Sequence, residues 1–286
     1  MTSPTARDTG RPSPDLAAEH LAVYRHLALR EFGADLRIGL NLAFYRTFAV
    51  PAIARLLVDT GEMTERTQQR ADDTGLMMYE LIAHGPHHPR GRQVIASLNR
   101  IHRVYDITPD EYRYVLGTFV FIPTRWIDRY GPRRLNLRER EATWHFWCEV
   151  GRLMNVRDVP DTWHGFEQWF NAFERANFGH DAAATRLIDA TRDLLATRFP
   201  KSLHRWAGAA SDALLDEQVR RALGVPAPGR TIRIAVRGLL RVNALVRRFK
   251  AVPPDVFTPG QATRHYPAGY EIEELGPDPV RPAPRR

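Results

Sequence analysis

Cysteine and lysine are almost absent from this chain, and each absence narrows its chemistry. Of 286 residues only Cys148 is a cysteine, which excludes an intramolecular disulfide and a cysteine-ligated zinc or iron–sulfur site. Lys201 and Lys250 are the only lysines among 41 basic residues. Such a uniform preference for arginine is typical of GC-rich coding, so a basic isoelectric point does not by itself predict nucleic-acid binding.

Long apolar runs and strand signals are also scarce. The longest apolar run, residues 114–123, is far shorter than the roughly 20 residues of a membrane-spanning helix. The polar, proline-containing residues 1–14 lack the apolar run of a secretory signal, so we expect a cytoplasmic protein. No Asn-Gly or Asp-Gly turn occurs, and apolar/polar alternation is brief, so strands are not expected.

Helical periodicity runs through most of the chain and predicts one all-α, multi-helix domain over residues 14–251. Residues 1–13 are expected to be a disordered tail, and residues 252–286 a proline-rich, largely irregular and disordered tail. Helix starts, stops and proline breaks give about ten helices. They are expected over residues 15–33, from 35 to a break at Pro51, 64–85, 91–105, from 109 with an interruption at Pro123, 139–154, 162–178, 182–199, 202–223 and 230–249.

Common catalytic motifs are missing from the sequence. It contains no glycine-rich phosphate loop, H-E-x-x-H, G-x-S-x-G or C-x-x-C. Asp72 and Asp73 are similar to the paired aspartates of all-α terpene synthases, but a third carboxylate is missing at the expected spacing.

One histidine, His102, lies on the apolar face of its predicted helix, aligned with Ile95 and Leu98. A buried neutral histidine needs a partner for each ring nitrogen, or a metal on one nitrogen and an acceptor for the other. Position alone favours an ordinary core histidine with two hydrogen bonds, and leaves the metal ligand as the alternative.

Arg70 and Thr74 lie four residues apart and therefore share a helix face. Arg70 can bind a carboxylate, with the Thr74 hydroxyl beside it. The alternative is a surface arginine paired with Asp73, three residues on. The spacing allows both interpretations.

A longer pattern connects these residues. It comprises "NLAFYRTFAVPAIARLL", "RADDT", "LNRIHRVYDITPDEYRYVLGTFVFIPTRWIDRYGPRRLNLREREATW" and "EVGRLMNVRDVPDTWHGFEQW", in this order over residues 40–178. A histidine follows the threonine of R-x-x-x-T by 28 residues. In this pattern the chain resembles the oxygenase family that joins the fungal MpaB-type enzymes to the latex-clearing protein, or rubber oxygenase.

The resemblance implies a globin-like helical core that holds haem b, and dioxygen-dependent oxidation or cleavage of a hydrophobic, isoprenoid substrate. His102 matches the axial iron ligand, so it is the expected metal ligand. Arg70 and Thr74 match residues that line the haem and are expected to bind the cofactor and take part in catalysis. Rubber oxygenases carry a lysine before that threonine, where this chain has Asp73. Asp73, or its neighbour Asp72, is a further candidate for polar assistance.

A second feature is a basic segment near the end of the chain. Nine basic residues and no acidic residue lie between Gln218 and Pro254. Within it, residues 230–249 form an amphipathic pattern that fits an interfacial membrane helix. The pattern alone favours the alternative, a core-packed terminal helix with a solvated arginine face. We expect a peripheral membrane contact here and no nucleic-acid partner. The alternatives to an enzyme are a non-catalytic helical protein that binds a hydrophobic ligand, and a peripheral membrane adaptor.

Overall fold

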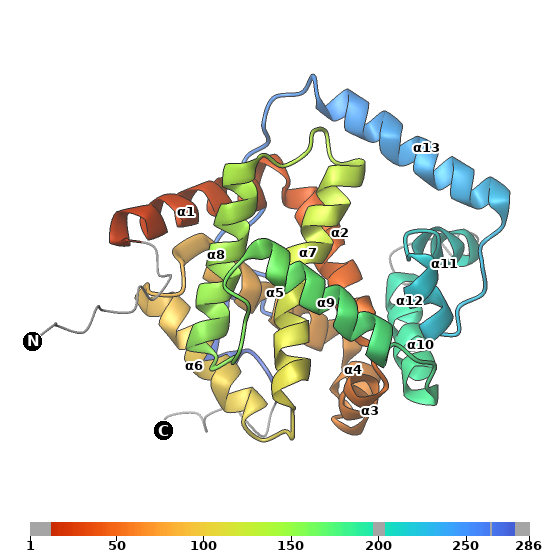
Figure 1. Ribbon diagram of the computed structural model, residues 1–286, viewed down its shortest axis with the longest axis horizontal. Coiled ribbons are helices and arrows are strands. Elements are labelled where there is room, and N and C mark those ends of the chain that lie inside the picture. The colour runs from red at the N-terminus through yellow and green to blue at the C-terminus, as the bar shows by residue number, and fades with distance from the viewer. Residues whose placement is uncertain (1–12, 197–203, 264, 278–286) are drawn as a thin grey trace, which may run out of the picture.

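The regular elements of this protein are all helices. The computed structural model describes residues 13–196, 204–263 and 265–277, and within these ranges it contains helices joined by turns and irregular segments (Figure 1). The prediction of a single all-α domain is therefore confirmed.

The helices follow one another closely along the chain. In order they are α1 (Pro14–His26), the π-helical turn η1 (Leu27–Glu31), α2 (Gly33–Thr47), α3 (Pro51–Asp59), α4 (Glu62–Glu65), α5 (Thr67–His84), α6 (Pro89–His102), α7 (Pro109–Tyr130), α8 (Leu137–Leu153), α9 (Trp163–Asn177), α10 (Ala182–Ala196), α11 (His204–Asp212), α12 (Glu217–Ala222), α13 (Arg230–Arg247) and the 3-10 turn η3 (Ile272–Glu274).

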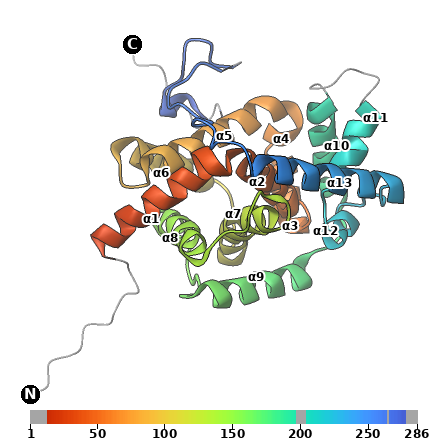
Figure 2. The same ribbon diagram turned by 90° about the horizontal axis from the view of Figure 1, so that it is seen from above.

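The long helix α7 lies at the centre of the fold, packed along α2 and against α8 and α9 (Figures 1 and 2). The main hydrophobic core gathers around it, and its largest buried side chains are aromatic. A second, smaller core joins α3 and α10 to α12. Aromatic residues bury large apolar areas, and this burial provides most of the stabilisation of such a core.

Pro123 lies inside α7 without ending it, so the predicted interruption at this residue is wrong. Proline removes one backbone hydrogen bond of the helix, but α2 packs directly on this point. A Cβ atom on Gly39 of α2 would come within 2.5 Å of the Pro123 Cα atom, so only glycine allows this approach. The close helix–helix packing compensates for the lost hydrogen bond.

The single helix predicted over residues 202–223 is also wrong, because a break separates α11 from α12. Asp216 lies in that break and caps α12, its carboxylate accepting a hydrogen bond from the Val219 N–H at 3.0 Å. The same carboxylate pairs with Arg46 of α2. A helix-capping aspartate held by a distant arginine favours a new helix start over continuation.

The predicted disorder of residues 252–286 is wrong for the C-terminal segment, by which we mean residues 252–263 and 265–277. This segment is irregular, but it packs on the core through Phe257, Tyr270, Ile272 and Leu275, each at most 5% exposed. Its apolar anchors were hidden in the sequence by the surrounding prolines. Residues 278–286 and 1–12, on which the rest of the two tail predictions falls, lie outside the described residues.

Candidate functional site

His102 is the last residue of α6, and its position follows from the ends of two helices. The Thr108 hydroxyl and the Glu111 carboxylate form a capping box that starts α7 only a few residues after α6 ends. The short connection places Tyr112, in the first turn of α7, edge-on to the His102 ring at 5.5 Å between ring centroids.

The hydrogen bonding of His102 fixes its tautomer. Its Nδ1 atom lies 2.7 Å from the Leu98 carbonyl oxygen, one helical turn earlier. Since a carbonyl oxygen only accepts, Nδ1 carries the hydrogen and Nε2 of the neutral ring has a free lone pair. Among the described residues, Nε2 has no hydrogen-bond partner. The ring thus has the arrangement of a metal-binding histidine whose other nitrogen is held by a carbonyl acceptor.

The surroundings also keep this imidazole neutral. Burial lowers the pKa of His102 below its ordinary value of 6.5; the hydrogen bond to Leu98 opposes this, and the charge of Arg70 lowers the pKa further. A neutral imidazole is the form that binds a metal.

A cavity of about 590 Å³ opens beside His102 at the junction of α6, α7 and α8. Tyr105, Tyr112, Met154 and Val156 contribute to its wall, and several asparagine and arginine side chains complete it. Its volume is in the range of small-molecule sites. Arg70 and Thr74 are not among the side chains that line it.

Arg70, on α5, is half-buried and has no acidic partner. Among the described residues, no carboxylate lies within ion-pair distance of it. Its Nη1 atom donates to the Thr74 hydroxyl, which in turn donates to the Arg70 carbonyl oxygen at 2.8 Å. Burial lowers the pKa of Arg70, although Asp73, Glu62 and Tyr105 act in the opposite direction. The interpretation as a surface arginine paired with Asp73 is therefore not what the structure shows.

Gly75, the residue after Thr74 on α5, has open space where a side chain would lie. A Cβ atom on Gly75 would find no other atom within 4 Å. Glycine inside a helix costs about 1 kcal/mol relative to alanine, and no close contact in the described residues requires it here. The result is open volume on one side of α5.

Asp73 points away from this arrangement. Its carboxylate is 1% exposed and accepts hydrogen bonds from the Tyr266 hydroxyl at 2.7 Å and the Gly276 N–H at 3.0 Å. Asp72 binds Nδ1 of His265 at 2.7 Å. Both aspartates thus attach the C-terminal segment to α5, which differs from the polar assistance for which they were candidates.

Sequence reasoning did not identify two groups at the site. The Leu98 carbonyl could have been found, because a histidine in the last turn of a helix can donate to the carbonyl four residues earlier. Tyr112 had no signal of its own, since its proximity to His102 depends on the angle between α6 and α7. No cluster of three His, Cys, Asp or Glu side chains that could hold a metal ion occurs in the described ranges.

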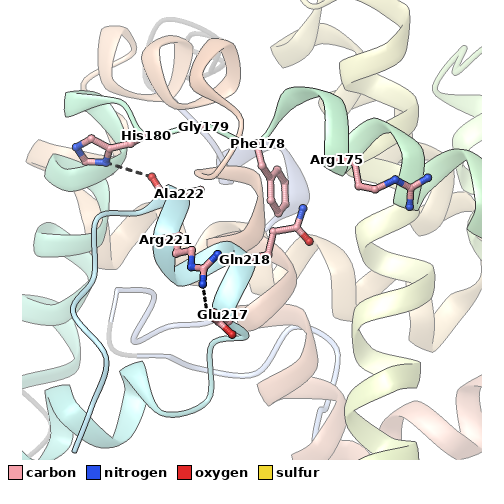
Figure 3. A pocket seen from close by; sticks show the side chains of 8 residues that line it. All are labelled: Arg175, Phe178, Gly179, His180, Glu217, Gln218, Arg221 and Ala222. Atoms are coloured by element: carbon pink, nitrogen blue, oxygen red, sulfur yellow. Dashed lines mark hydrogen bonds and ion pairs between the residues drawn. The ribbon is translucent and has the colours of Figure 1, made fainter.

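A second cavity, of about 500 Å³, lies between the end of α9 and α12 (Figure 3). Its polar side chains are used locally: Arg221 pairs with Glu217, and Nδ1 of His180 contacts the Ala222 carbonyl oxygen at 3.3 Å. It contains none of the predicted site residues.

No helix in the described part of the chain has the length and apolarity to cross a bilayer.

Comparison with known proteins points to one family. Residues 30–247 match the family described as ER-bound oxygenase mpaB/B'/Rubber oxygenase, catalytic domain. The ER-bound oxygenase mpaB' of Penicillium brevicompactum is 23% identical over 253 residues, which cover 82% of this chain and 60% of that protein. The ER-bound oxygenase mpaB of Penicillium roqueforti is 24% identical over 201 residues, covering 64% of this chain and 67% of its own.

The chain therefore spans about 60% of the length of the first of these relatives. The match nevertheless includes α5, α6 and the connection to α7, which carry Arg70, Thr74 and His102. Because it extends over more than half of the residues, this all-helical chain belongs to the oxygenase family of the ER-bound MpaB enzymes and the rubber oxygenases, and thus to a family of oxidoreductases.

Proposed function

We propose that this protein is a haem b-dependent oxygenase that uses dioxygen to oxidise or cleave a hydrophobic, isoprenoid-like substrate. The observation that carries the proposal is the His102 imidazole, with Nδ1 held by the Leu98 carbonyl and a free lone pair on Nε2. In a haem the porphyrin supplies four ligands, so a single histidine is sufficient to hold the iron.

The residues fit such a group. His102 would hold the iron, kept neutral by burial and oriented by Leu98. Arg70 would bind a propionate carboxylate, which would give this half-buried cation the anionic partner it lacks among the described residues. Thr74 holds the Arg70 guanidinium in place and is a positioning residue.

When bound, haem iron would supply the redox chemistry by which dioxygen is activated. The chain's own contribution is to bind and orient the cofactor and to exclude water from it. At the position where rubber oxygenases carry a lysine, Asp73 is held by Tyr266 and Gly276. We therefore propose that no charged side chain from this position reaches the iron, and that Asp73 stabilises α5 instead.

The proposed substrate class is based on the names of the relatives and on the residues that line the cavity beside His102. The family description includes a rubber oxygenase, and the first relatives are named as ER-bound oxygenases. The cavity beside His102 has tyrosine, methionine and valine in its wall, which suits a hydrophobic ligand with a few polar groups. We propose a cytoplasmic protein, peripheral to the membrane, that takes such substrates.

One absorption spectrum tests the cofactor. Protein purified after expression with added haem should show an intense band at roughly 400 nm, as haem proteins do. The variant His102→Ala should lose this band or bind haem far more weakly. The matched control His164→Ala removes an exposed histidine of α9 and should keep the spectrum of the wild type.

A colourless wild-type protein that takes up no haem on titration would overturn the proposal. The main alternative, a non-catalytic protein that binds a hydrophobic ligand, predicts ligand binding without dioxygen consumption. An oxygen electrode with a panel of isoprenoid substrates separates the two, because uptake that depends on His102 occurs only in the oxygenase.

A further inference from the structure

Helix α13 lies along the outer edge of the molecule (Figures 1 and 2). The attached face consists of Ile232, Val236, Leu240 and Ala244, spaced by four residues and half-buried. Leu240 packs on the main core, and Arg247 pairs with the buried Asp35 at 2.6 Å. No residue of α13 is fully buried. Helix α13 is therefore packed on the body of the molecule without being part of its core.

The face of α13 that points away from the body is apolar. Eight of the eleven exposed large apolar side chains in the described ranges lie between Ile234 and Val256, so the exposure is concentrated here. At 100° per residue, six of them form one stripe on the helix and its last turn: Ile234, Leu239, Val242, Leu245, Val246 and Phe249. Leu239 is 71% exposed and Phe249 is 85% exposed. A contiguous apolar stripe of this kind marks an interaction surface.

Arginines form a third stripe between these two faces. They are Arg230, Arg233, Arg237, Arg241 and Arg248, all exposed. Within the described ranges, none of them has a carboxylate within ion-pair distance. Elsewhere in the chain exposed arginines do pair, as Arg138 does with Glu19 and Arg55 with Asp181. These five arginines thus lie without acidic partners next to an exposed apolar stripe.

A cavity of about 590 Å³ continues this surface at the C-terminal end of α13. Arg248 and Lys250 line it together with Arg133, Arg247 and Glu31. Arg133 and Arg247 are neutralised by Glu31, Glu139 and Asp35. Arg248 and Lys250 have no such partner among the described residues. The cavity therefore offers two free cations beside the exposed Phe249.

We infer that α13 is a membrane-docking helix, which lies flat on an anionic bilayer with its apolar stripe among the acyl chains and its arginines at the phosphates. Apolar residues on one side and arginines beside them are the pattern of an interfacial helix. The unpaired cations supply the charge complementarity to anionic lipid headgroups. The apolar stripe excludes a purely electrostatic ligand such as DNA, because phosphate contacts alone would leave it in water.

A second copy of this chain is a poorer occupant of the same face. Two copies of α13 packed through their apolar stripes would bring their arginine stripes close together, without carboxylates from the helix to neutralise them. Like charges at such a distance oppose association. This docking is independent of the proposed oxygenase activity, since it needs neither His102 nor a cofactor.

The test uses the full chain and sedimentation with lipid vesicles. Phosphatidylcholine vesicles containing phosphatidylglycerol should bind the protein, and vesicles of phosphatidylcholine alone should bind it far more weakly. The triple variant Arg233→Gln, Arg237→Gln, Arg241→Gln should lower the partition coefficient about 100-fold, since each surface arginine contributes about fivefold. Added salt should weaken wild-type binding in the same direction.

The apolar stripe needs its own variant. The exchange of Leu239, Val242 and Leu245 for asparagine should lower binding at least about tenfold, and these exposed positions should leave the fold intact. Two matched controls change the same properties elsewhere on the surface. The double variant Leu137→Asn, Val104→Asn removes exposed apolar side chains. The triple variant Arg55→Gln, Arg138→Gln, Arg152→Gln removes three charges. Both controls should bind like the wild type.

A fluorescent label then reports insertion directly. Burial raises the pKa of Cys148 to about 12, so this thiol reacts slowly near neutral pH, and Leu245→Cys provides the reactive site. An environment-sensitive dye at residue 245 should shift to the blue with anionic vesicles. Binding that the asparagine variant leaves unchanged, binding to DNA but not to vesicles, or a dimer that forms through α13 without vesicle binding would each overturn the inference.

Discussion

Two arginines of this protein, the buried Arg46 and the half-buried Arg70, have opposite environments. Arg46, on α2, is bound by Glu174 through two nitrogens and by Asp216 through a third, and the Tyr114 hydroxyl donates to the same Glu174 at 3.2 Å. Burial disfavours the charged form of Arg46, but these acidic partners outweigh it and raise its pKa. Arg70, on α5, has only the Thr74 hydroxyl and its own turn of helix, and its pKa is lowered.

The difference distinguishes a charge that stabilises the fold from a charge that is available to bind a ligand. Burying a cation is costly unless an anion accompanies it. At Arg46 the fold supplies that anion from α9 and from the N-cap of α12, and so connects three helices. At Arg70 the described residues supply none, although Asp73 is only three residues away. A half-buried cation without an acidic partner is consistent with a place reserved for an anionic ligand.

The largest effect is expected when the paired arginine is removed. Arg46→Leu leaves Glu174 buried at 3% exposure without its cation, and should lower the free energy of unfolding by about 3–5 kcal/mol. Urea denaturation of the purified protein measures this. Arg55→Leu, at an exposed ion pair with Asp181, should cost at most about 1 kcal/mol. Equal losses for the two variants would show that the Arg46 cluster is not a special stabilising element.

A smaller effect of a different kind is expected at Arg70. Arg70→Leu removes a cation that has no buried acidic partner, so the haem-free protein should be as stable as the wild type or more stable. Haem affinity should instead fall about 10- to 100-fold, the usual value of a hydrogen bond to a charged group. Haem titration and urea denaturation of the same preparation measure both quantities. A large loss of stability with unchanged haem affinity would reverse the comparison of the two arginines.

The smallest effect is expected in the dependence of stability on pH, to which His102 contributes. The pKa of His102 is lowered from 6.5 in the folded protein, so the unfolded chain binds more protons as the pH falls through 6.5. Stability should therefore decrease on acidification, by at most about 1.4 kcal/mol per pH unit for one group. His20, His84 and His145 also have lowered pKa values through burial, and they share this trend.

The contribution of His102 is isolated by difference. The variant His102→Gln should show a shallower loss of stability between neutral pH and pH 5 than the wild type, when both are measured by urea denaturation without haem. Parallel curves would mean that His102 titrates as freely in the folded protein as in the unfolded chain.

Periodicity and helix signals were sufficient for the fold class and for most helix positions. The helix predicted from residue 35 to a break at Pro51 is confirmed by α2, and α3 begins at that proline. Local signals failed at two positions where tertiary packing determines the structure. At Pro123 the helix continues because Gly39 lets α2 approach closely. At Asp216 a new helix starts because Arg46 holds this residue. Neither partner is near in sequence, so no local pattern could reveal it.

The candidate site shows the same limit. The shared face of Arg70 and Thr74 followed from helical spacing, and the family pattern singled out His102. What the spacing could not show is that Asp73 binds Tyr266 and Gly276, which lie 193 and 203 residues later in the chain. From the sequence alone, Asp73 could pair with Arg70 or face solvent. In the structure it does neither, because the C-terminal segment binds it.

The path of the C-terminal segment also determines when α5 acquires its last contacts during synthesis. Asp73 and Glu80 of α5 are buried against the Tyr266, Gly276 and Tyr270 groups that bind them. During synthesis the two partners of Asp73 leave the ribosome about 200 residues after α5, so this carboxylate lacks them until then. We expect the helix that carries Arg70 to reach its final stability only after this segment has been made, so uptake of the proposed cofactor would follow that step.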